Sequence, residues 1–290
     1  MKPQFHKVPL NLQNSYSARH DRLPNFGTVW HYHPELELHY VIKGEGVRLI
    51  GDNISNFSSG EIILLGKDLP HTWRCRDEYF QHNPGLEVEA VVIHFLPECL
   101  GQHLLDLPEA FLLTRLFEKA RNGMLFGAGA RESLAPLMLS AVEASNLDRL
   151  ILLLTILKTL AETTDYKPIA SPQQTLLKTS AADNSRLNTV WTYTLTHYKK
   201  DITLEEIAAV ANLSVTSFCR YFKLLTQKTY YDFLIQIRVS HACRLLVENK
   251  LPTEMVCFEC GFNNVSNFYR HFKKVTGLTP LLYKRHYLGT

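Results

Sequence analysis

Three histidines and one glutamate have a spacing that could hold a metal ion. His31, His33 and Glu37 lie in the run His31-Tyr-His-Pro-Glu-Leu-Glu37, and His71 ends a later segment that begins at Gly60. The first three share parity, so on a strand their side chains would point to one face. Imidazole and carboxylate groups together suit Zn, Ni, Fe or Mn. The four residues are therefore candidate metal ligands.

The same residues fit two other interpretations. They could form a metal-free polar pocket for a small effector, or their polar groups could simply satisfy one another. Aromatic faces suit a sugar or another ring, and the nearby residues that could line such a pocket are Trp30, Tyr32, Tyr40, Trp73 and Arg74. The candidate effector-binding residues are His31, His33, Glu37, His71 and Trp73.

One pattern occurs twice in the last third of the chain. Phe218, Arg220, Phe222, Thr226 and Thr229 recur fifty positions later as Phe268, Arg270, Phe272, Thr276 and Thr279. In each copy a small residue, Asn212 or Gly261, falls where the chain must turn through a left-handed conformation. Phenylalanines four positions apart lie on one helix face, which we expect to be buried. The repeat predicts two helix-turn-helix motifs.

The remaining positions of each second helix face outward and are candidate DNA-contacting residues. They are Thr216, Cys219 and Arg220 in the first copy and Ser266, Asn267, Tyr269 and Arg270 in the second. Arg suits guanine and Asn suits adenine at major-groove edges. The alternative for each residue is a phosphate contact or a solvated helix face.

Charge and cysteine usage agree with an intracellular nucleic-acid binder. Residues from Asn184 onward include 14 Lys and Arg against 7 Asp and Glu, whereas the preceding segment has 17 against 21. A basic C-terminal unit suits a polyanion. The chain shows no apolar leader and no apolar run near the roughly 20 residues of a membrane span, so we expect its six cysteines to be reduced, in the cytoplasm and away from membranes. Cys257 and Cys260 align with Ala208 and Ala211 of the first copy, which favours small core residues over a metal or redox pair.

The residue patterns divide the chain into parts of different fold class. Short β-rich runs up to about Phe95 predict an all-β barrel over residues 1–107, and helical spacing follows over residues 108–165. A Pro- and Ser-containing linker is expected over residues 166–185, before an all-α domain over residues 186–290. The predicted architecture is thus multidomain. The predicted strands are 36–42, 46–50, 61–65 and 88–95, and the predicted helices are 110–120, 131–144 and 147–162.

Residues from about Asn25 to Phe95 resemble the two signature motifs of the cupin barrel. The motifs here are His31-x-His33-x3-Glu37-x6-Gly44 and the segment from Gly60 to His71. The resemblance implies a six- to eight-stranded double-sheet barrel, and in cupin enzymes these three histidines and one glutamate hold a divalent metal. The second motif departs from the pattern after His71, where Thr-Trp-Arg replaces the expected spacing to Asn.

The last hundred residues resemble the DNA-binding domain of AraC/XylS-type transcription regulators. The resemblance is carried by residues 204–208, 214–222, 261–262, 266–274 and 279–280. It implies seven helices in two subdomains, joined by a long helix from Tyr230 to about Glu248. It also implies that the two recognition helices enter successive major-groove segments about one helical turn, roughly 34 Å, apart. Arg238 matches a position that is usually structural in this family.

We therefore expect a cytoplasmic, one-component transcription regulator that is not an enzyme. Its expected partners are double-stranded promoter DNA, a small-molecule effector such as a sugar, RNA polymerase, and a second copy of the chain bound through the helices of residues 108–165. Activation and repression remain equally open. The alternative is a metal-dependent cupin enzyme, with isomerase or dioxygenase chemistry, fused to a DNA-binding domain.

Overall fold

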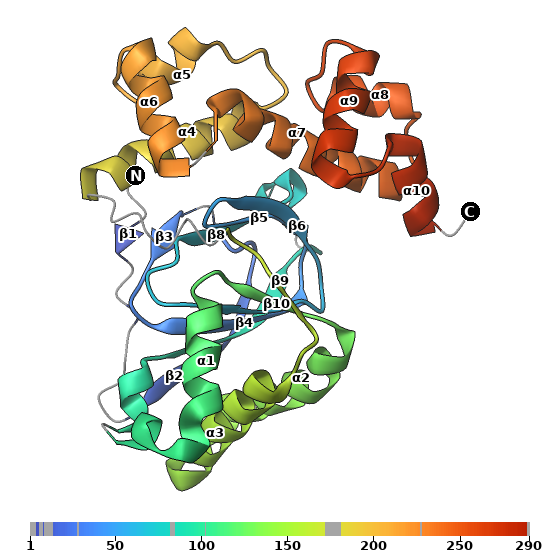
Figure 1. The fold of residues 1–290 in the computed structure, drawn as a ribbon. Coiled ribbons are helices and arrows are strands. Elements are labelled where there is room, and N and C mark those ends of the chain that lie inside the picture. The colour runs from blue at the N-terminus through green and yellow to red at the C-terminus, as the bar shows by residue number, and fades with distance from the viewer. Residues whose placement is uncertain are drawn as a thin grey trace. The chain divides into compact units, whose positions relative to one another are not determined.

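The computed structural model describes residues 4–5, 8, 14–27, 29–81, 85–101, 103–171, 181–226 and 228–288. The chain divides into two compact units, made mainly of residues 3–177 and 178–290. Each is drawn in Figure 1 and described below by itself. Within the described residues, no helix has the length and apolar character needed to cross a membrane.

The N-terminal unit contains two sheets. The five-stranded sheet has the order β1-β3-β8-β5-β6 and the six-stranded sheet the order β11-β10-β7-β4-β9-β2. The strands are β1 (Gln4–Phe5), β2 (Tyr16–Leu23), β3 (His31–Tyr32), β4 (Leu36–Lys43), β5 (Gly46–Ile50), β6 (Asn53–Phe57), β7 (Ile62–Leu65), β8 (His71–Cys75), β9 (Val88–Phe95), β10 (Met124–Phe126) and β11 (Tyr166–Pro168). The four predicted strands match β4, β5, β7 and β9. The expected sheet-rich N-terminal domain is confirmed.

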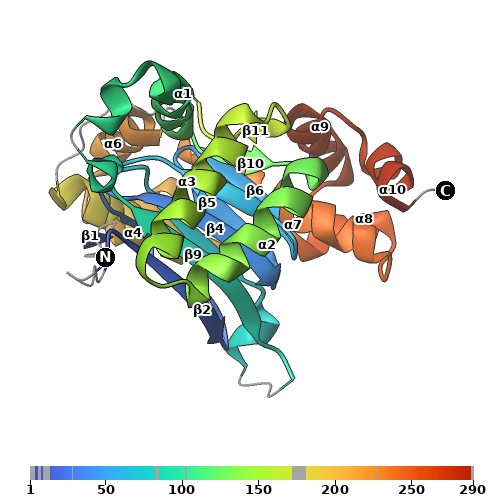
Figure 2. The ribbon, with the colours of Figure 1, turned by 90° about the horizontal axis from the view of Figure 1, so that it is seen from below.

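The two faces of the six-stranded sheet pack against different partners. One face, with Leu38 and Ile93, lies in a core shared with the helices α1 (Phe111–Ala120), α2 (Ala128–Glu143) and α3 (Asn146–Glu162). Figure 2 shows α2 and α3 lying across this sheet. The other face, with Ile63 and Leu65, packs against Trp73 and Cys75 of the five-stranded sheet. Strand alternation therefore separates a helix-facing core from a barrel interior.

The predicted linker begins with residues that are part of this unit. Tyr166–Pro168 forms β11, which pairs with β10 in antiparallel register. Ala181 already belongs to α4. The segment 172–180 lies outside the described residues, so the linker between these points stays a prediction.

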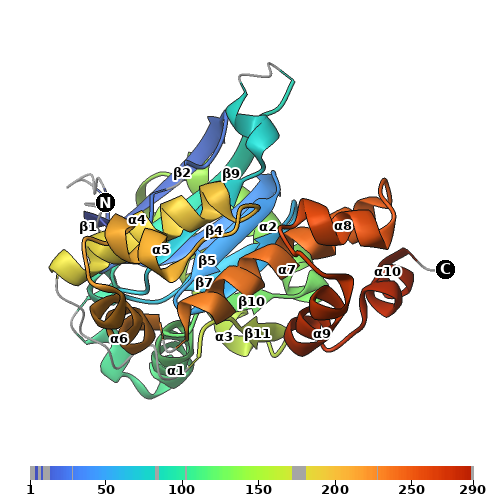
Figure 3. The ribbon, with the colours of Figure 1, turned by 90° about the horizontal axis from the view of Figure 1, so that it is seen from above.

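The C-terminal unit is helical throughout its described residues. Its helices are α4 (Ala181–His197), α5 (Leu204–Val210), α6 (Val215–Thr226), α7 (Tyr230–Glu248), α8 (Thr253–Glu259), α9 (Val265–Thr276) and α10 (Pro280–Leu288). Figure 3 shows α7 running between the group that contains α6 and the group that contains α9. The bounds of α7 agree with the expected long connecting helix, and the helical C-terminal domain is confirmed.

A buried arginine connects the long helix to the segment between α4 and α5. Arg238 of α7 donates from Nε to the carbonyl oxygen of Tyr198 at 2.8 Å and from Nη2 to that of Lys200 at 2.7 Å. Its guanidinium also lies 5.8 Å from the ring centre of Phe262 in the second motif. Arg238 therefore connects both halves of the unit, which agrees with the structural role expected for it.

Candidate functional site

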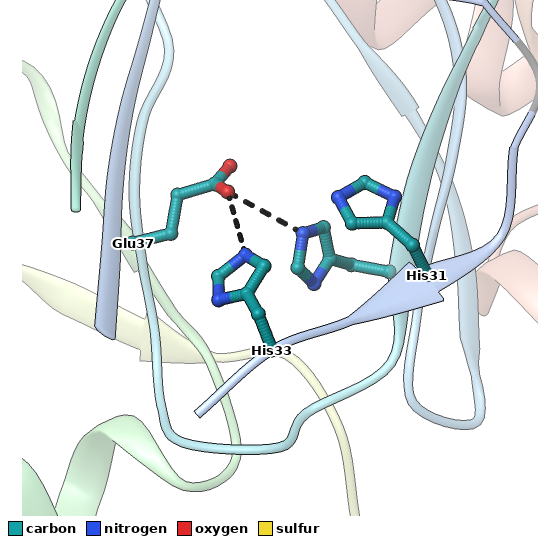
Figure 4. Close-up of side chains that lie close together, drawn as sticks. His31, His33 and Glu37 are labelled. Carbon is teal, nitrogen blue, oxygen red and sulfur yellow. Dashed lines mark hydrogen bonds and ion pairs between the residues drawn. The ribbon is translucent and has the colours of Figure 1, made fainter. Parts of the chain in front are cut away.

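The four candidate ligands come together in the barrel unit. His31 on β3 pairs directly with His71 on β8, His33 follows β3, and Glu37 belongs to β4. One ligand atom from each residue lies within 4.8 Å of the others, and all but His31 are buried. Figure 4 shows dashed lines from the carboxylate of Glu37 to His33 and to a second ring, with His31 on the far side of that ring. The pairing of β3 with β8 and the packing of the two sheets thus gather residues that are up to forty positions apart.

Backbone carbonyls set the tautomer of the three histidines. Each Nδ1 lies at hydrogen-bond distance from the carbonyl oxygen two residues away in sequence: His31 from Val29 at 3.0 Å, His33 from Glu35 at 3.0 Å, and His71 from Leu69 at 2.8 Å. A carbonyl only accepts, so Nδ1 carries the proton and Nε2 of the neutral ring carries a lone pair. This is the outer hydrogen bond that metal-ligating histidines make.

The lone pairs converge on a carboxylate. Oε2 of Glu37 lies 3.1 Å from Nε2 of His33 and 3.4 Å from Nε2 of His71. The Nε2 atom of His71 is fully buried and has no hydrogen-bond partner among the described residues. Acceptors that face one another in a buried site require a cation between them, either a proton or a metal ion. The donor set of three imidazoles and one carboxylate fits a divalent transition metal.

The protonation states agree with this donor set. Burial, followed by the neighbouring His71, lowers the pKa of His31 to about 3, so this ring is neutral. Burial alone would raise the pKa of Glu37, but the surrounding histidines hold it well below its usual range. Burial opposes protonation of His33 as well, yet the hydrogen bond and charge of Glu37 raise its pKa. The raised pKa of His33 favours a shared proton between its Nε2 and the carboxylate of Glu37.

Two further histidines contact Glu37 and were not anticipated from the sequence. His39 is two positions along β4 and has the same parity, a signal that the sequence did contain. His94 lies directly opposite Glu37 in the β4–β9 register, and that pairing joins residues 57 positions apart. Only the sheet register could have identified His94.

The residues expected to line a pocket fall into different places. Trp73 is buried and stacks on His39, with ring centres 4.2 Å apart. Trp30 is also buried. Tyr40 packs against the helix-facing core, on the sheet face opposite to Glu37. Arg74 forms an ion pair with Asp77 at 2.9 Å. Of these residues, Trp73 is the one that extends the histidine cluster through a stacked ring.

The second candidate site consists of the outer faces of α6 and α9. Their inner faces are formed by Phe218 and Phe222 and by Phe268 and Phe272, all fully buried. The turns before them take the predicted left-handed conformation, with φ of 53° at Asn212 and 81° at Gly261. The second helix of each motif is thereby fixed against its partner, with one face left outward.

Six of the seven candidate DNA-contacting residues lie on these outer faces, whereas Tyr269 packs against the buried cluster of the second motif. Asn267 and Tyr269 are half-buried, and the others are exposed: Thr216, Cys219, Arg220, Ser266 and Arg270. The side chain of Asn264 caps α9 by accepting from the backbone N–H of Asn267. The Cys257–Cys260 pair is fully buried among the apolar residues of the second motif, which agrees with a core role.

The comparisons with known proteins cover both units. Residues 15–91 match the AraC-like ligand binding domain, and residues 207–286 match the helix-turn-helix domain. An uncharacterised HTH-type transcriptional regulator, YdeC of Bacillus subtilis, is 36% identical over 89 residues, which cover 31% of each chain. The Msm operon regulatory protein of Streptococcus mutans is 20% identical over 277 residues, which cover 95% of this chain and 92% of that protein.

A solved structure is also similar to part of the chain. The DNA-binding domain of AdpA in complex with a target DNA is 31% identical, covers 36% of this chain and 94% of that one, and has a TM-score of 0.35. The first relatives in sequence are matched over only 31% to 55% of their own length. One matching domain lies in each of the two units, and the chain is similar to AraC-type transcription regulators in both.

Proposed function

We propose that this chain is a sequence-specific DNA-binding transcription regulator that reads an operator through α6 and α9. The observation that supports the proposal is that the two motifs have the same residues at their buried positions but different residues on their outer faces. Phe218 and Phe222 occupy the same positions as Phe268 and Phe272, whereas Cys219 stands where the second copy has Tyr269. One chain would then contact two different segments of the major groove, about one helical turn apart.

The base-contacting residues follow from this geometry. Arg220 and Arg270 keep both position and chemistry in the two copies, and Arg is the side chain best suited to guanine. Ser266 and Asn267 stand at the exposed start of α9, where recognition helices meet base edges. Thr216 and Cys219 offer shorter side chains on α6, so we expect weaker base discrimination from the first motif.

The histidine cluster is the sensing site in this proposal. A divalent metal held by His31, His33, Glu37 and His71 would connect β3 and β8 of one sheet to β4 of the other. A bound metal supplies a Lewis-acidic centre, which can also hold an oxygen-rich effector such as a sugar. Binding at this site would bias transcription only if it favoured one arrangement of the DNA-binding units over another.

A second copy of the chain is the expected structural partner. Leu139 of α2 and Leu147 and Ile151 of α3 are large apolar residues that remain exposed. Apolar residues gathered on a helix pair indicate an interaction site. We propose homodimerisation through α2 and α3, with promoter-bound RNA polymerase as the target of regulation inside the cell. Light scattering on the wild type and on Ile151→Lys tests the dimer.

The test uses operator DNA isolated from fragments of the source genome by the full-length protein. Affinity for that DNA is measured for the metal-free protein, for the Zn²⁺-loaded protein, and for each with candidate sugars. We expect a change in affinity or in transcription from the operator. Specific binding and transcription that stay the same under every condition would contradict the sensing role, and failure to select any sequence would contradict the regulator.

The donor set also favours one other candidate, a metal-dependent enzyme of the isomerase or dioxygenase type. Such an enzyme needs open positions on the metal for substrate. The relatives named above are transcriptional regulators, which favours regulation. Turnover of a substrate by the metal-loaded protein, lost in His33→Ala, would support the enzyme.

A further inference from the structure

Both oxygens of Glu37 are held by histidines outside the four-residue donor set. Oε1 lies 3.0 Å from Nδ1 of His39, and Oε2 lies 2.7 Å from Nε2 of His94. A carboxylate accepts and does not donate when ionised, so both imidazoles act as donors. The side chain of His94 is 1% exposed and that of Glu37 is 4% exposed, so water does not compete for these bonds.

An arginine sets the tautomer of His94. Nη1 of Arg19 lies 3.2 Å from Nδ1 of His94. Because a guanidinium can only donate, Nδ1 must accept and the ring proton must sit on Nε2, directed at Glu37. Both nitrogens of His94 therefore have protein partners, Arg19 at Nδ1 and Glu37 at Nε2.

The three residues lie on neighbouring strands of one sheet. Glu37 on β4 stands directly opposite His94 on β9, and Ser17 on β2 stands on the other side of His94. Arg19 is two positions from Ser17 and so shares its face, diagonal to His94. The main-chain ladder of β2, β9 and β4 thus fixes the spacing of the whole row.

We propose that Arg19 and His94 are positioning residues for metal binding by Glu37. Arg19 keeps the proton of His94 on Nε2. The hydrogen bond from His94 then holds Oε2 of Glu37 so that the remaining lone pair of this oxygen points toward the Nε2 atoms of His31, His33 and His71. This inference rests on the metal site proposed above and adds the residues that preorganise it. Loss of such an outer partner typically weakens metal binding about 10–100-fold.

The test is a Co²⁺ titration of the full-length, metal-free protein, followed by visible absorption and by competition for the dissociation constant. The variants are His94→Leu, His94→Gln, Arg19→Met and the double variant His94→Gln/Arg19→Met. A glutamine amide places an N–H donor close to the position of Nε2 and needs no arginine to set a tautomer. His20→Ala is the matched control, because His20 neighbours Arg19 on β2, alternates to the other face and binds Glu89 instead.

The expected pattern has four parts. His94→Leu weakens Co²⁺ binding about 10–100-fold and shifts the visible spectrum, because Glu37 is free to turn. His94→Gln recovers most of the affinity and the wild-type spectrum. Arg19→Met weakens Co²⁺ binding when His94 is present. It causes no further loss when His94 has been replaced by glutamine. His20→Ala behaves like the wild type.

Several results would overturn the proposal. Equal losses in His94→Gln and His94→Leu would make His94 a ligand and not a positioning residue. Additive effects of Arg19→Met in both backgrounds would show that Arg19 does not act through the tautomer. A wild-type protein that binds operator DNA but takes up neither Co²⁺ nor Zn²⁺ would remove the metal site and this role while leaving the DNA-binding function intact.

Discussion

Arg270 donates a hydrogen bond from Nη2 to Oδ1 of Asn267, 2.7 Å away and one turn earlier on α9. The backbone N–H of Asn267 donates in turn to Oδ1 of Asn264, which caps the helix. The start of α9 therefore has a side chain that caps the backbone N–H of Asn267 and an arginine bonded to the side chain of the same residue. This linkage holds the Arg270 guanidinium in one orientation before DNA arrives, which reduces the side-chain entropy lost on binding.

Replacing Arg270 tests whether this orientation serves base recognition. We expect Arg270→Ala to lower affinity for the selected operator by about 1–3 kcal/mol and affinity for random DNA by less. Asn267→Ala should cause a smaller loss, because the arginine remains but is no longer held. Fluorescence anisotropy on both DNAs measures the difference. Arg270→Lys keeps the positive charge but lacks the two N–H groups that can bind guanine together. If the lysine variant kept full operator specificity, Arg270 would contact a phosphate and not a base.

Cys219 provides a chemical probe of the α6 face. It is the one exposed residue among the chain's six cysteines, whereas burial raises the pKa of Cys260 to about 12. A thiol reagent should therefore modify Cys219 first in the native protein, since the thiolate is the reactive form. Operator DNA should protect it, because α6 would lie in the groove. Mass spectrometry of the labelled protein measures both effects; labelling of Cys219 at the same rate with and without operator would place α6 outside the groove.

Replacing Gly261, the turn glycine of the second motif, should reduce stability far more than replacing Gly277, another glycine in the left-handed conformation. Gly261 has φ of 81°, and an added Cβ would lie 2.6 Å from the carbonyl oxygen of Tyr198. Gly277 has φ of 79° but nothing within 4 Å. We expect Gly277→Ala to cost about 1 kcal/mol and Gly261→Ala about 3 kcal/mol. Hydrogen exchange of the α8 and α9 amides in the full chain measures local stability; equal effects would mean that the close contact is not limiting.

Arg238 should contribute to stability and not to base reading. Arg238→Met keeps the bulk but leaves the carbonyl oxygens of Tyr198 and Lys200 without their charged donor, at a cost of about 3 kcal/mol. Arg244→Met is the matched control on the same helix, because its partly exposed pair with Glu248 at 3.5 Å should contribute less than about 1 kcal/mol. Urea unfolding followed by circular dichroism compares them. Similar losses in both variants would show that the backbone carbonyls find other donors.

The C-terminal unit could be predicted closely because its information is local. The four-residue spacing of Phe218 and Phe222 and the small residue at Asn212 fix a helix, its buried face and its preceding turn within about ten positions. The same logic applies to Gly261 and Phe268. The repeat adds a second source of information, because a position that is buried in one copy predicts that the equivalent position of the other copy is buried.

The barrel unit could be predicted only in part because its contacts are long-range. β4 and β9 are strongly apolar and were predicted, whereas β2 reads Tyr16-Ser-Ala-Arg-His-Asp-Arg-Leu23, a polar strand at the sheet edge with weak alternation. The local motif contained His31, His33 and Glu37. The neighbours that orient Glu37 depend on the register of β2 and β9, which the order of residues does not specify on its own.

The most direct test of the central claim is a selection of randomised DNA by the full-length protein, with Arg220→Ala and Arg270→Ala compared in parallel. The claim is that one chain reads two different segments through α6 and α9. We expect an asymmetric site whose two preferred segments are centred about 10 base pairs apart, with each variant relaxing base preference in one segment only. A single preferred segment, or two variants that relax the same positions, would contradict the account.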